Sequence, residues 1–289
     1  MTNTGRVEAA EATDVLLRAA EANRTDPFRR YGVVRLPDYG QVVLTGDMHG
    51  NRANFAKLAR FAMLDRATVR HVILHELIHA DTPPGGLDMS HELLLDAARW
   101  KCDFPEQVHF LQSNHELSQL TDHQILKGGR VVIEDFRRSV ELTYGPAGGR
   151  RVYEAMLEFL ASFPIAARTA NRIWVSHSLP TPDDIATFDF SVFDRELRPD
   201  DLRPGGAVYQ LVWGRRFTTP QLAELGRRWD VDSFVVGHIP QDFGYDVRLG
   251  RVLILASDHN HGVFLPLELS RPQQMDDLVA AIRKFVAVP

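Results

Sequence analysis

The sequence predicts a layered α/β sandwich. Strand-like and helical stretches alternate along the first half of its 289 residues, whereas the second half is rich in short apolar, strand-like runs. Several of these runs are followed closely by a polar cluster, namely GDMHG, HELIH, SNHE, SHSLP and GHIP. Because folds of this class build their sites from loops at strand ends on one edge of a sheet, we expect these clusters to converge.

The individual elements follow from hydrophobic periodicity. Residues 7–24 are predicted to form an amphipathic helix, since Ala12, Val15, Leu16 and Ala19 recur at helical spacing. Elsewhere, apolar or β-branched runs predict strands, and apolar residues three and four apart predict helices. In chain order we expect a hairpin of 32–36 and 41–45, a helix over 52–66, a strand over 69–74, a helix over 90–100 capped by Ser90, a strand over 107–111, a helical insert over about 118–163, a hairpin of 165–167 and 173–175, and strands over 234–236, 247–249, 252–256 and 263–267. No linker divides the chain, so we expect a single domain over residues 1–289.

Composition narrows the classes of function. Lys and Arg number 33 against 38 Asp and Glu, so the net charge of −5 provides no platform for nucleic acid or an anionic membrane. The single cysteine, Cys102, excludes an intrachain disulfide framework, an all-thiolate zinc site and an iron–sulfur cluster. No apolar stretch reaches the roughly 20 residues of a membrane span, and no signal peptide is evident, so we expect a soluble cytoplasmic protein. The 12 histidines leave hydrolytic metal chemistry open.

Three strand-end clusters carry candidate metal ligands. Asp47 and His49 flank Met48, so a carboxylate and an imidazole could face one ion, although a turn with a helix-capping Asp would look the same. Asn114 and His115 follow another strand and suggest one ligand and one proton donor, or else an ordinary helix start. His177 and His238 each end a strand, where a lone histidine is more often a hydrogen-bonded core residue.

Taken together, these motifs carry a family resemblance. GDMHG, SNHE, FPIAARTANRIWVSHSLP and FVVGHIPQDFGY, in this order, resemble the calcineurin-like metallophosphoesterases, above all the branch that contains the Ser/Thr protein phosphatases. The resemblance extends from about Arg35 to Leu269. It implies a four-layer α-β-β-α sandwich of two mixed β-sheets flanked by helices.

The resemblance also implies a dinuclear phosphoesterase, in which a metal-bridging hydroxide attacks the phosphorus of a phosphate ester. The implied ligands are Asp47 and His49 for one ion, Asn114, His177 and His238 for the other, and Glu76 between them. His115 matches the histidine that assists the leaving group. Two divalent ions, Mn, Fe or Zn, suit this oxygen and imidazole set. The substrate could be a phosphorylated small molecule, a nucleotide or a phosphoprotein.

The second family motif, GDxxDRG, is altered in this chain. Glu76 takes the place of the bridging Asp, and His79 that of the Asp that pairs with the leaving-group histidine. We expect a second imidazole neither to raise the pKa of His115 nor to orient it well. Ala80 replaces an Arg that the family uses on phosphate.

Other side chains are candidates for binding the substrate. Arg52 and Arg215 (with Arg216) could supply the missing cation, or they could be solvated surface residues. Asp258 and His259, in ASDHNHG, are either substrate contacts or part of a polar hairpin tip, which we favour.

Two other functions remain open. The altered positions 76, 79 and 80 suggest a binding protein of the same fold with weakened or lost catalysis. HELIH, residues 75–79, also spells the HExxH signature of zinc metalloproteases, which requires both histidines on one face of a helix. The strand-like VRHVIL before it and Pro83-Pro84 after it argue against that helix. In the phosphoesterase interpretation, His75 is a supplementary ligand or a neighbour of the ligands.

Overall fold

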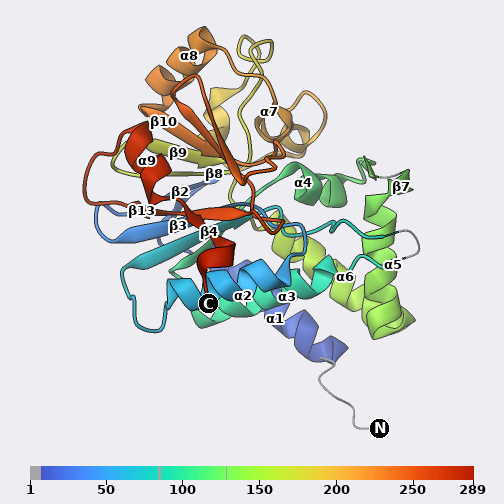
Figure 1. The fold of residues 1–289 in the computed structure, drawn as a ribbon. Coiled ribbons are helices and arrows are strands. Elements are labelled where there is room, and N and C mark those ends of the chain that lie inside the picture. Colours follow the sequence, from blue (N-terminus) through green and yellow to red (C-terminus); the bar gives the residue numbers. More distant parts are fainter. Residues whose placement is uncertain (1–7, 84–85, 128) are drawn as a thin grey trace.

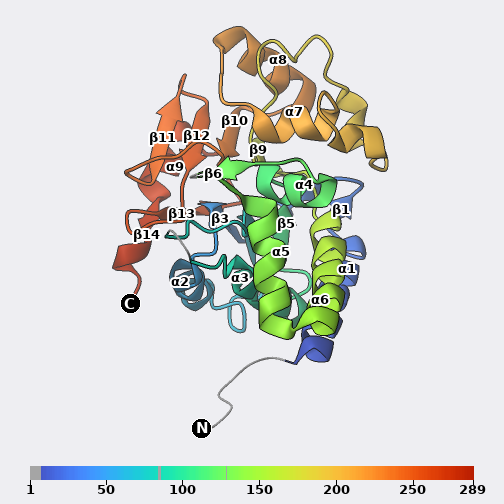
Figure 2. The same ribbon diagram turned by 90° about the vertical axis from the view of Figure 1, so that its right-hand side faces the viewer.

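The computed structural model describes residues 8–83, 86–127 and 129–289 as four stacked layers (Figures 1 and 2). A seven-stranded and a five-stranded mixed sheet form the two middle layers. Helices α7 and α8 cover the outer face of the first sheet, and α1, α2, α3, α5 and α6 cover that of the second (Figure 1). The predicted four-layer sandwich of two mixed sheets is therefore confirmed.

The strands lie in the following order across each sheet. The seven-stranded sheet runs β1 (Arg29–Arg30), β2 (Val33–Arg35), β8 (Ala166–Arg168), β9 (Ile173–Ser176), β10 (Ser233–Val236), β12 (Val252–Leu255) and β11 (Tyr245–Arg248). The five-stranded sheet runs β14 (Arg283–Lys284), β13 (Val263–Glu268), β3 (Gln41–Asp47), β4 (Arg70–His75) and β5 (Val108–Leu111). A two-stranded ribbon joins β6 (Leu126–Lys127) to β7 (Arg130–Val131).

The helices have these bounds: α1 Ala9–Arg24, α2 Arg52–Ala62, α3 Ser90–Asp103, α4 Asn114–Thr121, α5 Val132–Tyr144, α6 Pro146–Ala161, α7 Ala207–Trp213, α8 Thr219–Trp229 and α9 Met275–Ala281. Short 3₁₀ turns cover Phe190–Phe193, Pro199–Leu202 and Phe285–Ala287. Each helix in these ranges is too short or too polar to cross a bilayer.

Strand alternation explains why two sheets stack in the middle of the molecule. In β3 and β4, Val43 and Val72 pack into the core under the helices, whereas Val42, Leu44 and Ile73 pack into the core between the sheets. Successive strand side chains point to opposite faces, so a continuous apolar run supplies both cores at once. Both faces of each central strand are buried as a result.

Strand direction brings the polar clusters to one edge. β4 is parallel to β3 and to β5, and β10 is parallel to β9 and to β12. Asp47, at the end of β3, also forms a parallel bridge with Ala256, directly after β12. The carboxyl ends of parallel strands from both sheets therefore meet at the same edge.

Three expectations about local structure are wrong. The runs 32–36 and 41–45 do not form a hairpin, because β2 pairs with β1 and β8, whereas β3 pairs with β4 and β13 in the other sheet. Residues 256–262 are not a hairpin tip, since β12 and β13 also lie in different sheets. Ser90 is the first residue of α3 rather than its cap, and its hydroxyl accepts the backbone N–H of His79 at 2.9 Å. The hairpin of β8 and β9 is confirmed.

A charged network is buried far from that edge, beneath β4 and β5. Lys101, which is fully buried, donates to Asp26 at 3.0 Å, and Asp26 also accepts from Nδ1 of His109 at 2.9 Å. Nε2 of His109 lies 3.0 Å from Nδ1 of His71. Burial raises the pKa of Asp26, but the hydrogen bond from His109 and the charge of Lys101 outweigh it and lower that pKa to about 2. Burial lowers the pKa of His71 to about 4.

We expect the neutral His71 to make the fold sensitive to acid. In the unfolded chain His71 has the ordinary pKa of 6.5, whereas in the folded chain its pKa is about 4. As the pH falls through this window, the proton binds to the unfolded chain first, and the free energy of unfolding decreases. We expect the wild type to lose about 2–3 kcal/mol more of its unfolding free energy than His71→Asn between pH 7 and pH 4.5. Urea unfolding of the metal-free protein at both values measures it.

The exposed His261 provides the control, because His261→Asn should leave the pH dependence of stability unchanged. Equal pH dependence in the wild type and His71→Asn would contradict the assignment of a neutral, buried His71.

Candidate metal centre

The strand-end edge holds a cluster of buried histidine and acidic side chains. Two groups within it have ligand atoms that all lie within 4.8 Å of one another. The first is Asp47, His75 and His177, and the second is His49, Glu76 and His115. Asn114 and His238 adjoin the first group, since the Asn114 Oδ1 and the His238 Nδ1 lie 2.7 and 3.2 Å from the His177 Nε2. The structure thus brings together all six residues predicted as ligands, and His115 with them.

Asp47 is held by backbone from both sheets. It ends β3 in register with His75 of β4, and its carboxylate accepts the backbone N–H of His238 at 2.9 and 3.0 Å. The adjacent Gly237 is needed for this approach, because a Cβ there would lie 2.2 Å from Oδ1 of Asp47 and 2.8 Å from Cε1 of His75. Glycine therefore makes the room in which the carboxylate and the two loops meet.

The protons of the first group can be assigned from its partners. The Nε2 of His75 faces the carbonyl oxygen of Thr45 at 2.8 Å, and since a carbonyl only accepts, this nitrogen donates. The Nδ1 of His75 then accepts from Nδ1 of His177 at 3.1 Å, which leaves Nε2 of His177 with a lone pair. That lone pair accepts from Nδ1 of His238 at 3.2 Å, since the Nε2 of His238 itself accepts from Arg215. Two oxygen atoms, Oδ1 of Asn114 and Oε2 of Glu76, lie 2.7 and 3.4 Å from the same nitrogen.

The second group also brings an imidazole nitrogen close to a carboxylate. His49 donates through Nδ1 to the carbonyl oxygen of Ile78 at 3.0 Å, so its Nε2 presents a lone pair toward Oε2 of Glu76, 3.9 Å away. A histidine that ligates a metal commonly donates its other ring N–H to a carbonyl in this way. Imidazole nitrogens that converge with carboxylate and amide oxygens suit a cation, and this set of ligands suits Mn, Fe or Zn.

A relay of side chains orients His115. The Nε2 of His79 donates to Oε1 of Gln119 at 2.7 Å, so the Nδ1 of His79 accepts from Nδ1 of His115 at 2.8 Å. The Nε2 of His115 is thereby directed toward Oε1 of Glu76, 3.6 Å away. The expectation that an imidazole at position 79 would orient His115 poorly is therefore wrong. A neutral imidazole still supplies no negative charge to stabilise a protonated His115.

Main-chain contacts hold the two loops of this centre together. The carbonyl oxygen of Glu76 accepts the backbone N–H groups of Met48 and His49 at 2.9 and 2.8 Å. From the other side, the buried carboxylate of Glu116 accepts the N–H of Leu77 at 2.7 Å. Burial raises the pKa of Glu116 to about 7, although the hydrogen bonds it accepts oppose this.

Backbone strain is concentrated in the same loops. His49, Glu76, His79 and His238 have φ values of 39°, 51°, 61° and 66°, in the left-handed region that residues other than glycine seldom adopt. Strained backbone of this kind costs about 1–3 kcal/mol per residue and persists where the surrounding structure imposes it. Among the described residues, four with such a backbone thus lie at this one edge of the fold.

Burial keeps three histidines of this edge, His75, His177 and His238, neutral. It lowers the pKa of His75, and it lowers that of His177 further because other histidines surround it. The pKa of His238 is lowered to about 4, first by burial and then by the adjacent charge of Arg215. Neutral imidazole is the form that binds a metal, so no proton has to leave these rings near pH 7.

The residues predicted to bind substrate fall into different settings. Arg215 donates from Nε to Nε2 of His238 at 3.0 Å, which places its charge beside the cluster. Arg52 instead forms ion pairs with Glu92 and Asp96 at 2.5 and 2.7 Å, and two carboxylates already engage its guanidinium.

The segment that carries Asp258 and His259 is hydrogen-bonded to the beginning of α2, the helix that follows GDMHG. Asn51 donates to the carbonyl oxygen of Asp258 at 2.9 Å, and Asn54 donates to that of His259 at 3.1 Å. His259 is bound further by Nε2, which lies 2.9 Å from the carbonyl oxygen of Gln241. The segment therefore lies beside the first turn of α2.

The zinc protease hypothesis is wrong. His75 is the last residue of β4, and the residues after it form a loop rather than a helix. The two histidines accordingly have separate partners, Thr45 and His177 for His75, and His115 and Gln119 for His79. The helical spacing of HExxH does not apply to an extended chain.

Sequence reasoning undervalued three positions: His75, Glu116 and Gly237. The motifs predict only a supplementary role for His75, at the end of a strand. In the structure its ring nitrogen lies within 4.8 Å of ligand atoms of both Asp47 and His177. The requirement for Gly237 arises from contacts across two sheets, and local sequence gives no signal for it. Glu116, in SNHE, could have been suspected as a buried carboxylate in the first turn of α4, next to a site.

We expect Gly237→Ala to disrupt the centre. Its Cβ would collide with the Asp47 carboxylate and the His75 ring, so affinity for a divalent ion should fall by at least about tenfold. Titration of metal-free protein with Mn²⁺, read by calorimetry, measures this. Gly148→Ala in α6 is the control, and binding by Gly237→Ala with wild-type affinity would exclude this cluster as the metal site.

No protein-family model and no curated protein matches the chain. Among solved structures, one similar protein is a serine/threonine phosphatase of Saccharomyces cerevisiae with similarity to human phosphatase PP5: 17% identity, TM-score 0.67, covering 98% of this chain and 91% of that one. Another is the cold-active protein-tyrosine phosphatase of a Shewanella species: 16% identity, TM-score 0.59, covering 92% and 84%. At these identities the likeness establishes the fold alone: the chain shares the fold of these two phosphatases, as its motifs indicated.

Proposed function

We propose that this protein is a metal-dependent phosphoesterase that hydrolyses a phosphate ester. The observation that carries the proposal is the convergence of imidazole nitrogens with carboxylate and amide oxygens around the Nε2 of His177 and the carboxylate of Glu76. Nitrogen and oxygen ligands gathered in this way are favourable around a divalent cation. The fold, shared with proteins described as phosphatases, supports the same chemistry.

Seven side chains would hold a pair of divalent ions. Their positions favour Asp47, His75, His177, Asn114 and His238 around one ion and His49 and Glu76 around the other, with Glu76 close to both groups. When bound, such a pair activates water and neutralises the charge of the phosphoryl group. His75 is an addition to the set that the family resemblance implies.

His115 would act on the leaving group. Its Nδ1 proton is engaged by His79, so protonation has to occur at Nε2, the nitrogen directed toward Glu76. From Nε2 the imidazolium can pass a proton to the departing alkoxide oxygen. The contact with His79 fixes the ring, and the Glu76 carboxylate supplies the negative charge that His79 lacks.

Arg215 would bind the phosphoryl oxygens. It is the predicted cation that adjoins the cluster, through its 3.0 Å contact with His238, whereas Arg52 is occupied by two carboxylates. A guanidinium fixed at the edge of the site can orient a phosphate and stabilise charge in the transition state. This proposal gives Arg215 the role of the arginine missing at position 80.

We expect His115→Ala to lower kcat according to the leaving group. With an alkyl phosphate, whose alkoxide needs a proton, kcat should fall by about 10²–10⁴. With p-nitrophenyl phosphate, whose phenolate leaves readily, the loss should be much smaller. Steady-state kinetics with Mn²⁺ on both substrates measure the ratio, and elemental analysis of the variant measures metal content.

The two readouts separate the possible roles of His115. Equal losses on both substrates, or metal content reduced in the variant, would contradict the role of acid and make His115 a ligand. Arg52→Ala is a suitable control, because its ion pairs lie on the surface and its loss should change neither measurement.

The alternative, a binding protein without catalysis, is tested by the wild type alone. The altered positions Glu76, His79 and Ala80 motivate it. Bound metal together with hydrolysis of p-nitrophenyl phosphate or its bis ester supports the enzyme. Bound metal without turnover on any ester would favour the binding protein.

A further inference from the structure

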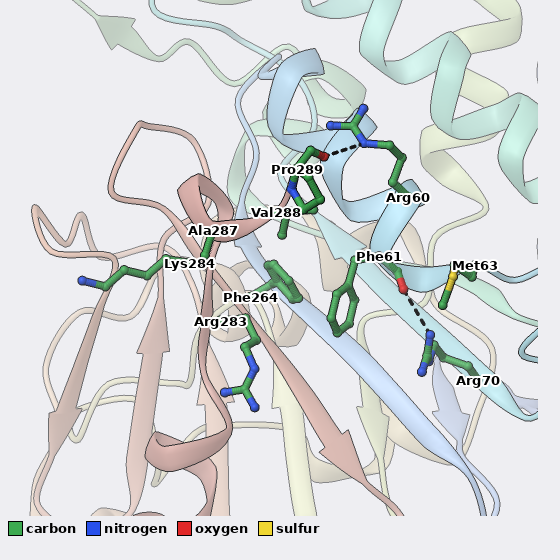
Figure 3. Close-up of a pocket in the computed structure, with 10 residues that line it drawn as sticks. All are labelled: Arg60, Phe61, Met63, Arg70, Phe264, Arg283, Lys284, Ala287, Val288 and Pro289. Carbon is green, nitrogen blue, oxygen red and sulfur yellow. Dashed lines mark hydrogen bonds between the residues drawn. The ribbon is translucent and has the colours of Figure 1, made fainter.

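A cavity of about 370 Å³ lies on the outer face of the five-stranded sheet, away from the metal centre (Figure 3). It is bounded by the end of α2, by β13 and by the segment from β14 to residue 289. Arg70, which lines it, begins β4, whereas His75 ends that strand at the metal centre. Five strand residues span about 16 Å, so the two sites are separate.

The interior of the cavity is apolar. The rings of Phe61 and the fully buried Phe264 are in edge contact with centroids 4.7 Å apart, and Figure 3 shows them at its centre. Met63 and Val288 extend this lining, and Met63 is 47% exposed. A volume of 370 Å³ lies within the range of about 300–1,000 Å³ that is typical of small-molecule sites.

The rim of the cavity is cationic. Arg60, Arg70, Arg283 and Lys284 line it, and its described lining includes no Asp or Glu. Within the described part of the chain, none of the four has an Asp or Glu side chain within ion-pair distance; Arg60 donates to the main-chain oxygen of Pro289, and Arg70 donates to two carbonyl oxygens. Arg70, Arg283 and Lys284 thus concentrate positive charge at one apolar cavity of a protein whose net charge is −5.

Arg70 is the most constrained of these cations. It donates from one terminal nitrogen to the carbonyl oxygens of Phe61 and Ala62 at 3.1 and 2.7 Å, which closes the end of α2. Its Nε is buried and has no hydrogen-bond partner in the described structure. Burial lowers the pKa of Arg70, since no neighbouring acid compensates its charge. An anion at the rim would supply both the missing acceptor and the missing charge.

We propose that this cavity binds a small amphipathic anion, an apolar chain that carries one carboxylate. The chain would lie against Phe61, Met63 and Val288, and the carboxylate would lie at the rim among Arg70, Arg283 and Lys284. Apolar walls provide affinity in proportion to the buried length of the chain, and the cations select the charged end. The site is independent of the phosphoesterase proposal.

Calorimetric titration of the full chain with octanoate and decanoate, below their micellar concentrations, tests this. We expect saturable binding of one ligand per chain, tightening by roughly fourfold for each CH₂ that becomes buried. 1-Decanol and acetate, which lack the charge and the chain respectively, should each bind at least tenfold more weakly than decanoate. Absence of saturable binding, or equal affinity for decanol, would overturn the proposal.

Exposed positions allow variants that leave the core intact. Arg283→Glu with Lys284→Glu should weaken decanoate binding at least tenfold, whereas Arg66→Glu with Arg271→Glu makes the same change of charge outside the cavity and should not. Ala287→Trp should fill part of the cavity and weaken binding, unlike Val286→Trp next to it. Equal effects of a variant and its control would show binding at the general surface and contradict the site.

Discussion

Asp47 connects the two sheets of this protein at the edge that carries the candidate metal centre. It ends β3 in register with His75 of β4, bridges to Ala256 after β12, and accepts the backbone N–H of His238 after β10. A single carboxylate is thereby fixed by strands from both sheets. Because Asp47 is also one of the candidate ligands, packing of the sandwich and geometry of the metal centre are set by the same contacts.

The centre combines converging ligand atoms with a main chain held at positive φ. The carbonyl oxygens of Thr45 and Ile78 accept hydrogen bonds from His75 and His49, which turns the other ring nitrogen of each histidine toward the cluster. Residues such as Glu76 and His238, held at positive φ, cannot turn away without loss of the backbone contacts of their loops. Pre-organisation of this kind reduces the reorganisation needed when a cation binds.

The sequence predicts the layered fold and the convergence of the site, because both follow from strands and their ends. Asp47, His49, Asn114, His177 and His238 were identified as candidates since each follows an apolar run, and parallel strands bring such positions to one edge.

What the sequence does not predict depends on contacts between distant segments. Pairing of β2 with β8 rather than β3 is set by which sheet each strand joins, and periodicity does not distinguish them. The space at Gly237 and the orientation of His115 by His79 likewise arise from contacts between segments that are distant in the sequence. The left-handed backbone of Glu76 is imposed by the surrounding loops against its own preference.

The hydrogen bonds from the amides of Met48 and His49 to the Glu76 carbonyl oxygen have a consequence for protein engineering. They use only main-chain atoms, so they do not depend on which side chain position 76 carries. That side chain could therefore be exchanged while the loop keeps its path. Position 76 is accordingly a natural starting point for redesigning the chemistry of the site without rebuilding its scaffold.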